Sequence, residues 1–151
     1  MTESTMVDEI ASKGRLVYSN SGTSMMPLIK QGRDLVVIVK PEFPLKAYDV
    51  PLYRRGDSTR FVLHRILKVT PDGYVIRGDN CLKKEYGIKD DDIIGVLSAV
   101  IRKGKEISVD NTGYKIYSRV WRYIFPVRFF YMKARAAGGK IKRKLKGNRK
   151  T

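Results

Sequence analysis

The sequence predicts a mainly β fold, a small multi-stranded body followed by a basic, partly helical tail. In the body, short apolar runs rich in β-branched residues alternate with turns rich in Gly, Pro, Asp and Asn, which is typical of antiparallel strands. In the tail, from Tyr114 onward, apolar residues recur at helical spacing. We therefore expect a segment with a short helix over residues 1–20, a β domain over 21–112 and a basic, amphipathic to disordered tail over 113–151.

Local patterns give the elements of the body in chain order. An N-terminal helix begins near Ser4 or Thr5 and ends at Gly14. Strands are predicted at residues 35–39, 49–53, 61–69, 74–77, 93–101 and 107–109, and a loop over 81–92. Pro51 lacks a backbone donor, so it places its strand at a sheet edge or at a bulge. Gly95 predicts a bulge in the strand at 93–101.

The tail is predicted to form two helices. Apolar residues at positions 116, 117, 120, 121 and 124 share one helical face, with Lys115, Arg119 and Arg122 opposite. Pro126 interrupts this helix, and a second helix is expected over residues 127–137. The run of Lys and Arg that follows residue 139 is expected to be disordered.

The positive charge of the chain is concentrated in this tail. The 151 residues contain 31 Lys and Arg against 15 Asp and Glu, which gives a formal net charge of +16. Residues 114–151 hold 13 of the basic residues and no acidic one, so residues 1–113 keep 18 basic and 15 acidic residues. A body so close to neutral argues against a protein that coats nucleic acid with its whole surface.

Several broad classes of protein are excluded by composition. The single cysteine, Cys81, allows neither an intrachain disulfide nor a Cys-rich zinc module, and no metal or cofactor is expected. The N-terminal residues are acidic and lack the apolar run of a secretory signal. No stretch reaches the roughly 18 uncharged apolar residues of a transmembrane helix. We therefore expect a cytoplasmic protein, with contact at a membrane surface as an option for the tail.

Three residue types that occur in the body can together perform nucleophilic catalysis. A serine hydroxyl is a poor nucleophile near neutral pH unless a base lies within hydrogen-bond reach. His64, the only histidine of the chain, suits that role because the ordinary pKa of histidine is about 6.5. A carboxylate can hold the imidazole in the required tautomer. Spacing along the chain does not show whether these groups meet.

The order of five short patterns resembles the signal peptidase and LexA-type serine peptidase superfamily. Gly-Thr-Ser-Met-Met-Pro at 22–27 is followed by a hydrophobic strand, by Val-Leu-His-Arg-Ile at 62–66, by Gly-Asp-Asn at 78–80 and by Ile-Ile-Gly at 93–95. The resemblance covers about residues 22–100. The bacterial membrane enzymes and the LexA-like proteins use lysine as the base, where this chain has His64. The chain is therefore more similar to the Ser-His branch, which includes the endoplasmic-reticulum and SipW-like signal peptidases.

This resemblance implies catalytic roles for the matching residues. Ser24 would be the acylating nucleophile, and His64 would be the general base and then the acid that protonates the leaving amine. The carboxylate that orients His64 would be Asp79, in the Gly-Asp-Asn pattern, or Glu85, six residues further on. The choice between these two carboxylates stays open.

Other residues would support the same site. Met25 and Pro27 would shape the turn and the substrate cleft, and the backbone N–H of Ser24 would contribute to an oxyanion hole. Cys81 is interpreted as structural, because the chain has no second histidine to pair with it.

The resemblance predicts a serine endopeptidase that cleaves a signal peptide, leader peptide or preprotein through an acyl-enzyme. Two alternatives remain: a self-cleaving LexA-like regulator, and a non-catalytic binding module that uses its basic tail on a membrane or nucleic acid. For residues 114–151, contact with an anionic membrane surface or with a protein partner is favoured over nucleic acid. No oligomeric state follows from these patterns.

Overall fold

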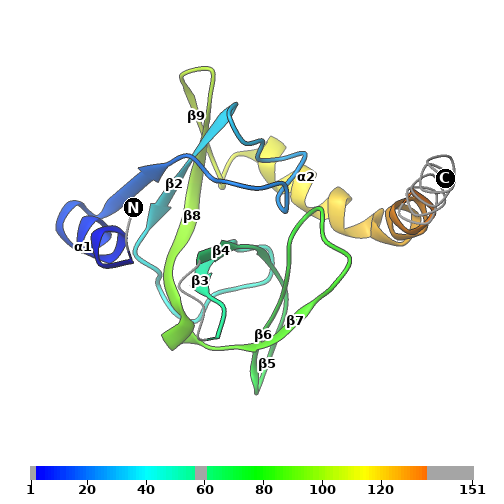
Figure 1. Ribbon diagram of the computed structural model, residues 1–151, viewed down its shortest axis with the longest axis horizontal. Coiled ribbons are helices and arrows are strands. Elements are labelled where there is room, and N and C mark those ends of the chain that lie inside the picture. The colour runs from blue at the N-terminus through cyan, green and yellow to red at the C-terminus, as the bar shows by residue number, and fades with distance from the viewer. Residues whose placement is uncertain (1–2, 57–60, 136–151) are drawn as a thin grey trace, which may run out of the picture. The chain divides into compact units, whose positions relative to one another are not determined.

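The computed structural model describes residues 3–56 and 61–135. The chain divides into two compact units, Met1–Ser118 and Arg119–Thr151. Within the described residues, nine strands form two antiparallel sheets, and all of these strands belong to the first unit (Figure 1). The predicted mainly β fold is therefore confirmed.

The larger sheet is organised around one long strand, β8 (Ile93–Arg102). β2 (Asp34–Val39) pairs with one edge of β8. The other edge is divided, because β3 (Pro51–Arg54) pairs with its first half and β9 (Lys105–Ser108) with its second half. Two short outer strands complete the sheet, β1 (Arg15–Tyr18) beside β2 and β4 (Phe61–Leu63) beside β3.

The smaller sheet begins one residue after β4 ends. Its strands, in order, are β5 (Arg65–Thr70), β6 (Gly73–Arg77) and β7 (Glu85–Ile88). The continuous strand predicted at 61–69 is therefore wrong: the chain leaves one sheet at Leu63 and enters the other at Arg65, with His64 between. Leu63 packs in the larger apolar cluster and Ile66 in the smaller one, and Val62 of β4 also packs against the smaller one.

The loop predicted over residues 81–92 is wrong in its second half. That half contains β7 and a short 3₁₀ helix, η1 (Asp90–Asp92). β7 has the sequence Glu-Tyr-Gly-Ile, and none of its four residues is fully buried. It therefore has neither the apolar run nor the apolar–polar alternation by which a strand is recognised from sequence.

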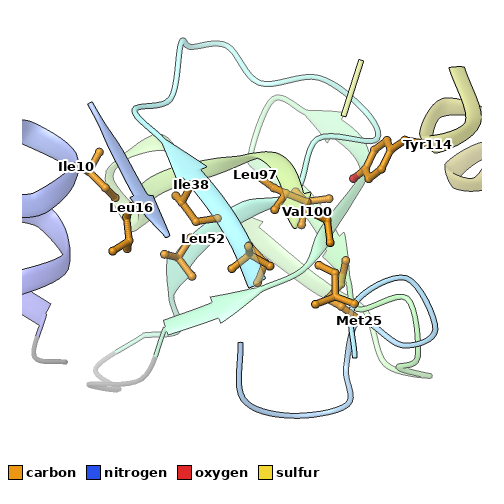
Figure 2. Packing of buried hydrophobic residues seen from close by; sticks show 12 residues of the cluster. Ile10, Leu16, Met25, Ile38, Leu52, Leu97, Val100 and Tyr114 are labelled. Carbon is orange, nitrogen blue, oxygen red and sulfur yellow. The ribbon is translucent and has the colours of Figure 1, made fainter. Parts of the chain in front are cut away.

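Two clusters of buried apolar side chains stabilise the first unit. The larger cluster receives side chains from three non-strand segments as well as from the large sheet: Figure 2 shows Ile10 of the N-terminal helix, Met25 of the loop after β1 and Tyr114 of the C-terminal helix. The smaller cluster consists of Leu45, Tyr53, Ile66, Tyr74, Ile76 and Ile93.

Pro51 and Gly95 mark an irregular pairing between β3 and β8. Leu52 lies opposite Gly95 and Tyr53 opposite Ile93, so the register shifts by one residue between them. The bulge predicted at Gly95 is confirmed. Of the two options for Pro51, the edge is excluded because β3 lies between β8 and β4. A Cβ atom on Gly95 would collide with the side chain of Ile38, so the close approach of β2 and β8 depends on this glycine.

The helices follow the sequence pattern closely. α1 (Glu3–Lys13) ends at Gly14, whose φ of 71° few other residues adopt readily. α2 (Thr112–Tyr123) is followed by further helix over residues 125–135. This second stretch begins earlier than predicted, since proline is tolerated in the first turn of a helix. The end of the predicted helix at 136–137 and the predicted disordered run lie outside the described residues.

None of the helices in the described part of the chain combines the length and the apolar character that a membrane span requires.

Candidate active site

His64 lies at the step between the two sheets and is almost completely buried, with 4% of its surface exposed. Its Nδ1 atom is 2.9 Å from Oε1 of Glu85 and 3.3 Å from the hydroxyl oxygen of Tyr53. An ionised carboxylate can only accept hydrogen bonds, so Nδ1 carries the hydrogen. The neutral ring then has an unprotonated Nε2, which is the form that a general base requires.

The side chains of three neighbouring residues interact with the carboxylate of Glu85. Arg55 donates to both of its carboxylate oxygens, at 2.6 Å each, and Tyr53 and His64 contribute further. Partial burial by itself would raise the pKa of Glu85, but the hydrogen bonds from Arg55 and Tyr53 and the charge of Arg55 outweigh it and lower that pKa. Glu85 therefore stays ionised beside the imidazole at neutral pH.

The pKa of His64 is lowered from its ordinary value. Burial is the largest cause, because it disfavours the charged imidazolium. The negative charge of Glu85 opposes this effect and the positive charge of Arg55 adds to it. The imidazole is consequently neutral at physiological pH, while Glu85 remains available to stabilise an imidazolium that forms transiently.

Ser24 lies in a compact turn between β1 and β2. The backbone N–H of Ile29 donates to the carbonyl of Met25 at 3.0 Å, and both of these side chains are fully buried in the larger cluster. Ser24 itself is partly exposed. Two core side chains therefore anchor the turn on which the hydroxyl is presented.

The structure corrects the role predicted for Met25. Its side chain belongs to the core and has no exposed surface, so it does not line an open substrate cleft. The reason is that the turn needs an apolar anchor directly after Ser24, and Met25 fills the space under it. Pro27, on the same turn, is exposed.

Asn80 joins the Ser24 turn to the Gly-Asp-Asn turn. Its backbone N–H donates to the carbonyl of Ser24 at 2.7 Å, and its side-chain amide donates to the carbonyl of Thr23 at 3.2 Å. Residues that are 56 positions apart in sequence are thus held side by side. The sequence analysis identified this turn through its aspartate and did not predict the role of Asn80.

Gly78 separates the Ser24 turn from the imidazole. A Cβ atom at this position would lie 2.7 Å from the carbonyl oxygen of Ser24 and 2.8 Å from Nε2 of His64. Both distances are shorter than real Cβ contacts allow, so only glycine lets these two groups approach the same small volume. The structure therefore brings the Ser24 turn to the Nε2 side of His64, and Glu85 to the Nδ1 side.

Cys81 lies on the same side of His64. Its sulfur is 4.0 Å from Nε2. The interpretation of Cys81 as a structural residue did not predict that it lies so close to His64. Burial raises the pKa of the Cys81 thiol, and the charge of Glu85 acts in the same direction. The thiol is therefore protonated at neutral pH, and a protonated thiol is a weak nucleophile.

Asp79 is engaged with a different partner, the buried guanidinium of Arg65. Two parallel hydrogen bonds of 2.9 and 2.8 Å join them, and the side chains are only 2% and 5% exposed. Burial works against the charge of Arg65, but the charge of Asp79 and its hydrogen bonds more than compensate, so the pKa of Arg65 is raised and it stays charged. The two carboxylates that the sequence left open therefore differ: Glu85 contacts His64, and Asp79 contacts Arg65.

Arg65 also connects the site to the C-terminal helix. Its Nη1 atom donates to the carbonyl of Tyr48 at 3.1 Å, to the hydroxyl of Tyr114 at 3.3 Å and to the hydroxyl of Ser118 at 3.0 Å. Tyr114 and Ser118 are one turn apart on α2. His64 and its sequence neighbour Arg65 thus point to opposite faces of the strand, as a period of two requires. This alternation is the one signal by which Arg65 could have been found.

No group of three or more histidine, cysteine, aspartate or glutamate side chains in the described part of the chain is placed to hold a metal ion.

Substitution of the two carboxylates should separate their effects on stability. Asp79→Asn removes the charge that balances buried Arg65, so we expect the free energy of unfolding to fall by about 3–5 kcal/mol. Glu85→Gln breaks a partly exposed pair with Arg55 and should cost about 1 kcal/mol or less. Urea denaturation followed by circular dichroism measures both values. Equal losses in the two variants would contradict this division.

Comparisons of the chain with protein-family models, with curated proteins and with solved structures found no match. The function of the protein must therefore be inferred from the geometry around His64 and from the order of the motifs. The geometry brings together the turn of Ser24, the imidazole of His64 and the carboxylate of Glu85, and it assigns Asp79 to the support of Arg65.

Proposed function

We propose that the protein is a serine endopeptidase in which Ser24 is the nucleophile, His64 the general base and Glu85 the carboxylate that orients His64. The single observation that carries this proposal is the 2.9 Å hydrogen bond between Nδ1 of buried His64 and Glu85. It leaves Nε2 unprotonated on the side where Gly78 admits the Ser24 turn. The order of motifs, which resembles the Ser-His branch of the signal peptidases, supports the same assignment.

The proposed reaction proceeds through an acyl-enzyme. Nε2 of His64 accepts the proton of the Ser24 hydroxyl as Oγ attacks the peptide carbonyl. When the tetrahedral intermediate collapses, the C–N bond breaks and the imidazolium gives the same proton to the leaving amine. Water then attacks the ester carbonyl while Nε2 of His64 accepts its proton; the bond between the acyl carbon and Oγ breaks, and the imidazolium returns the proton to Oγ, which releases the acid and free Ser24. The backbone N–H of Ser24 is a donor for the oxyanion, and signal or leader peptides are the proposed substrates.

The electrostatic environment suits this cycle. The lowered pKa of His64 keeps the resting base neutral, and ionised Glu85 stabilises the imidazolium that exists only during the reaction. The interaction with Glu85 is therefore stronger in the transition state than in the ground state, which is the condition under which an interaction accelerates a reaction.

A serine-reactive fluorophosphonate should label the intact protein and should fail to label Ser24→Ala. The matched control is Cys81→Ser, which removes the other nucleophile beside Nε2 and should retain labelling. Mass spectrometry of the labelled peptide measures the site. If labelling persists in Ser24→Ala and disappears in Cys81→Ser, the nucleophile is the thiol of Cys81 and not Ser24. If the wild-type protein is not labelled, the proposal is refuted.

The rate of this labelling should rise with pH through the lowered pKa of His64, so the midpoint of the rise should lie below the ordinary histidine pKa of about 6.5. The sign follows from the base, which is active only when neutral: protonation at low pH removes it, and a lowered pKa shifts that loss to lower pH. The measurement is the second-order rate constant of inactivation between about pH 4.5 and 9. A rise that occurs only above about pH 8 would instead indicate a lysine base.

Glu85→Gln should lower the same rate constant by about 10²- to 10⁴-fold, because the imidazolium loses its balancing charge. The acidic limb of the pH profile should also move to lower pH, since the charge of Glu85 raises the pKa of His64. Glu106→Gln is a matched control, because Glu106 is paired with Arg15 on the outer strands of the large sheet. If the two variants have the same rate and profile, Glu85 does not orient the base.

A further inference from the structure

A stripe of exposed apolar side chains follows the C-terminal helical region. Seven residues, of which six lie in α2 or in the helix over 125–135 and one, Ile124, lies between them, have between 37% and 76% of their surface exposed. They are Ile116, Val120, Tyr123, Ile124, Val127, Phe130 and Tyr131. Large apolar side chains grouped in this way on a protein surface indicate an interaction site, whereas single exposed ones need no explanation.

The spacing of these residues places them on one face. Backbone hydrogen bonds from Ile124 to Val120 and from Arg128 to Ile124 carry the helical path past the end of α2. At about 100° of rotation per residue, the seven positions fall within an arc of about 120°. On α2 itself, Tyr114 and Ser118, which are buried and bonded to Arg65, lie on the side opposite Ile116 and Val120.

Cations border this face on both sides. On the same helical projection, Lys115, Arg119 and Lys133 lie along one flank and Arg128 and Arg135 along the other. Arg128 is positioned over the ring of Trp121, 3.6 Å from its centre, and Lys133 is 4.6 Å from the ring centre of Phe129; both rings lie outside the stripe on this projection. Lys115 is paired with Asp110 at 2.9 Å, and no acidic residue occurs after Asp110. Every charged residue that borders the stripe beyond Lys115 is therefore positive.

This combination selects one class of partner. Phosphates of a nucleic acid would be bound by the cations alone and would leave an apolar centre unused. The acyl region of a bilayer accommodates an apolar stripe, and anionic headgroups accommodate lysine and arginine along its borders. Tyrosine and phenylalanine, which lie toward the edges of the stripe, suit the boundary between these two layers.

We propose that the helical region 116–135 binds the surface of a membrane that contains anionic lipid. The seven apolar side chains enter the boundary between headgroups and acyl chains, and the flanking cations contact the headgroup phosphates. The helix lies in the plane of the surface and does not cross the bilayer. This proposal is independent of the peptidase activity, because it depends on none of the residues Ser24, His64 and Glu85.

Vesicle co-sedimentation of the full chain tests this proposal. The vesicles contain phosphatidylcholine with about one third phosphatidylglycerol, or phosphatidylcholine alone. We expect binding to the anionic vesicles to be at least tenfold tighter and to weaken as salt is added. Equal binding to the two kinds of vesicle, or no binding to either, would overturn the proposal.

Two double variants test whether binding to vesicles depends on the stripe or on exposed apolar side chains in general. Val127→Ser with Phe130→Ser removes two side chains that are 74% and 73% exposed, so their loss leaves the core intact. We expect this variant to bind anionic vesicles at least tenfold more weakly. The matched control, Leu35→Ser with Val69→Ser, removes two exposed apolar side chains from strands of the first unit and should bind like the wild type.

A competition experiment addresses nucleic acid. Single-stranded oligonucleotide added in excess should displace the protein from vesicles only weakly, and the stripe variant should bind the oligonucleotide as the wild type does. If the oligonucleotide removes the protein completely and the stripe variant binds vesicles like the wild type, the cations alone carry the interaction. That result would assign the surface to nucleic acid and reject the membrane proposal.

Discussion

The buried ion pair between Arg65 and Asp79 is the constraint on which the site depends. The pair and three further hydrogen bonds of Arg65 tie together β5, the turn after β6, the segment before β3 and the first turns of α2. A charge so deeply buried is tolerated only with complete compensation, so these elements can pack in one arrangement only. The same arrangement sets the position of His64, which is the preceding residue, and of Gly78, which precedes Asp79. The pair contacts no reacting atom in the proposed mechanism, and yet it fixes both sides of the imidazole.

Much of the fold could be predicted because its signals are local. The apolar runs of β2 and β8, the turn of the β5–β6 hairpin and Gly14 at the end of α1 each carry their information within a few residues. β7 was missed because its side chains are partly exposed on both faces. The break at His64 was missed because apolar alternation continues through it, and only the existence of two separate cores reveals that the strand changes sheets.

The residue types of the candidate site could be predicted from the sequence, but the contacts between those residues could not. The motif order identified Ser24 and His64, but two carboxylates matched equally well in sequence. The choice between them depends on which side of β5 each one meets, and this is a property of three-dimensional packing. Arg55 and Tyr53 could not be found at all, because Tyr53 lies in β3 of the larger sheet and Arg55 follows that strand, 30 residues before Glu85 in β7 of the smaller sheet. Met25 was misassigned since a methionine beside a nucleophile fits a cleft and a core equally well.

The step from β4 to β5 restricts the number of residues between the two strands as well as their identity. His64 and Arg65 are adjacent, and their side chains serve opposite faces, each with its own carboxylate. Loss or gain of one residue between Leu63 and Ile66 would exchange the two faces. The arginine would then point toward Glu85 and Arg55, where a second cation is repelled, and the histidine would enter the niche lined by Asp79 and α2. Homologous chains that keep this arrangement should therefore vary in sequence around the step but contain no insertion or deletion within it.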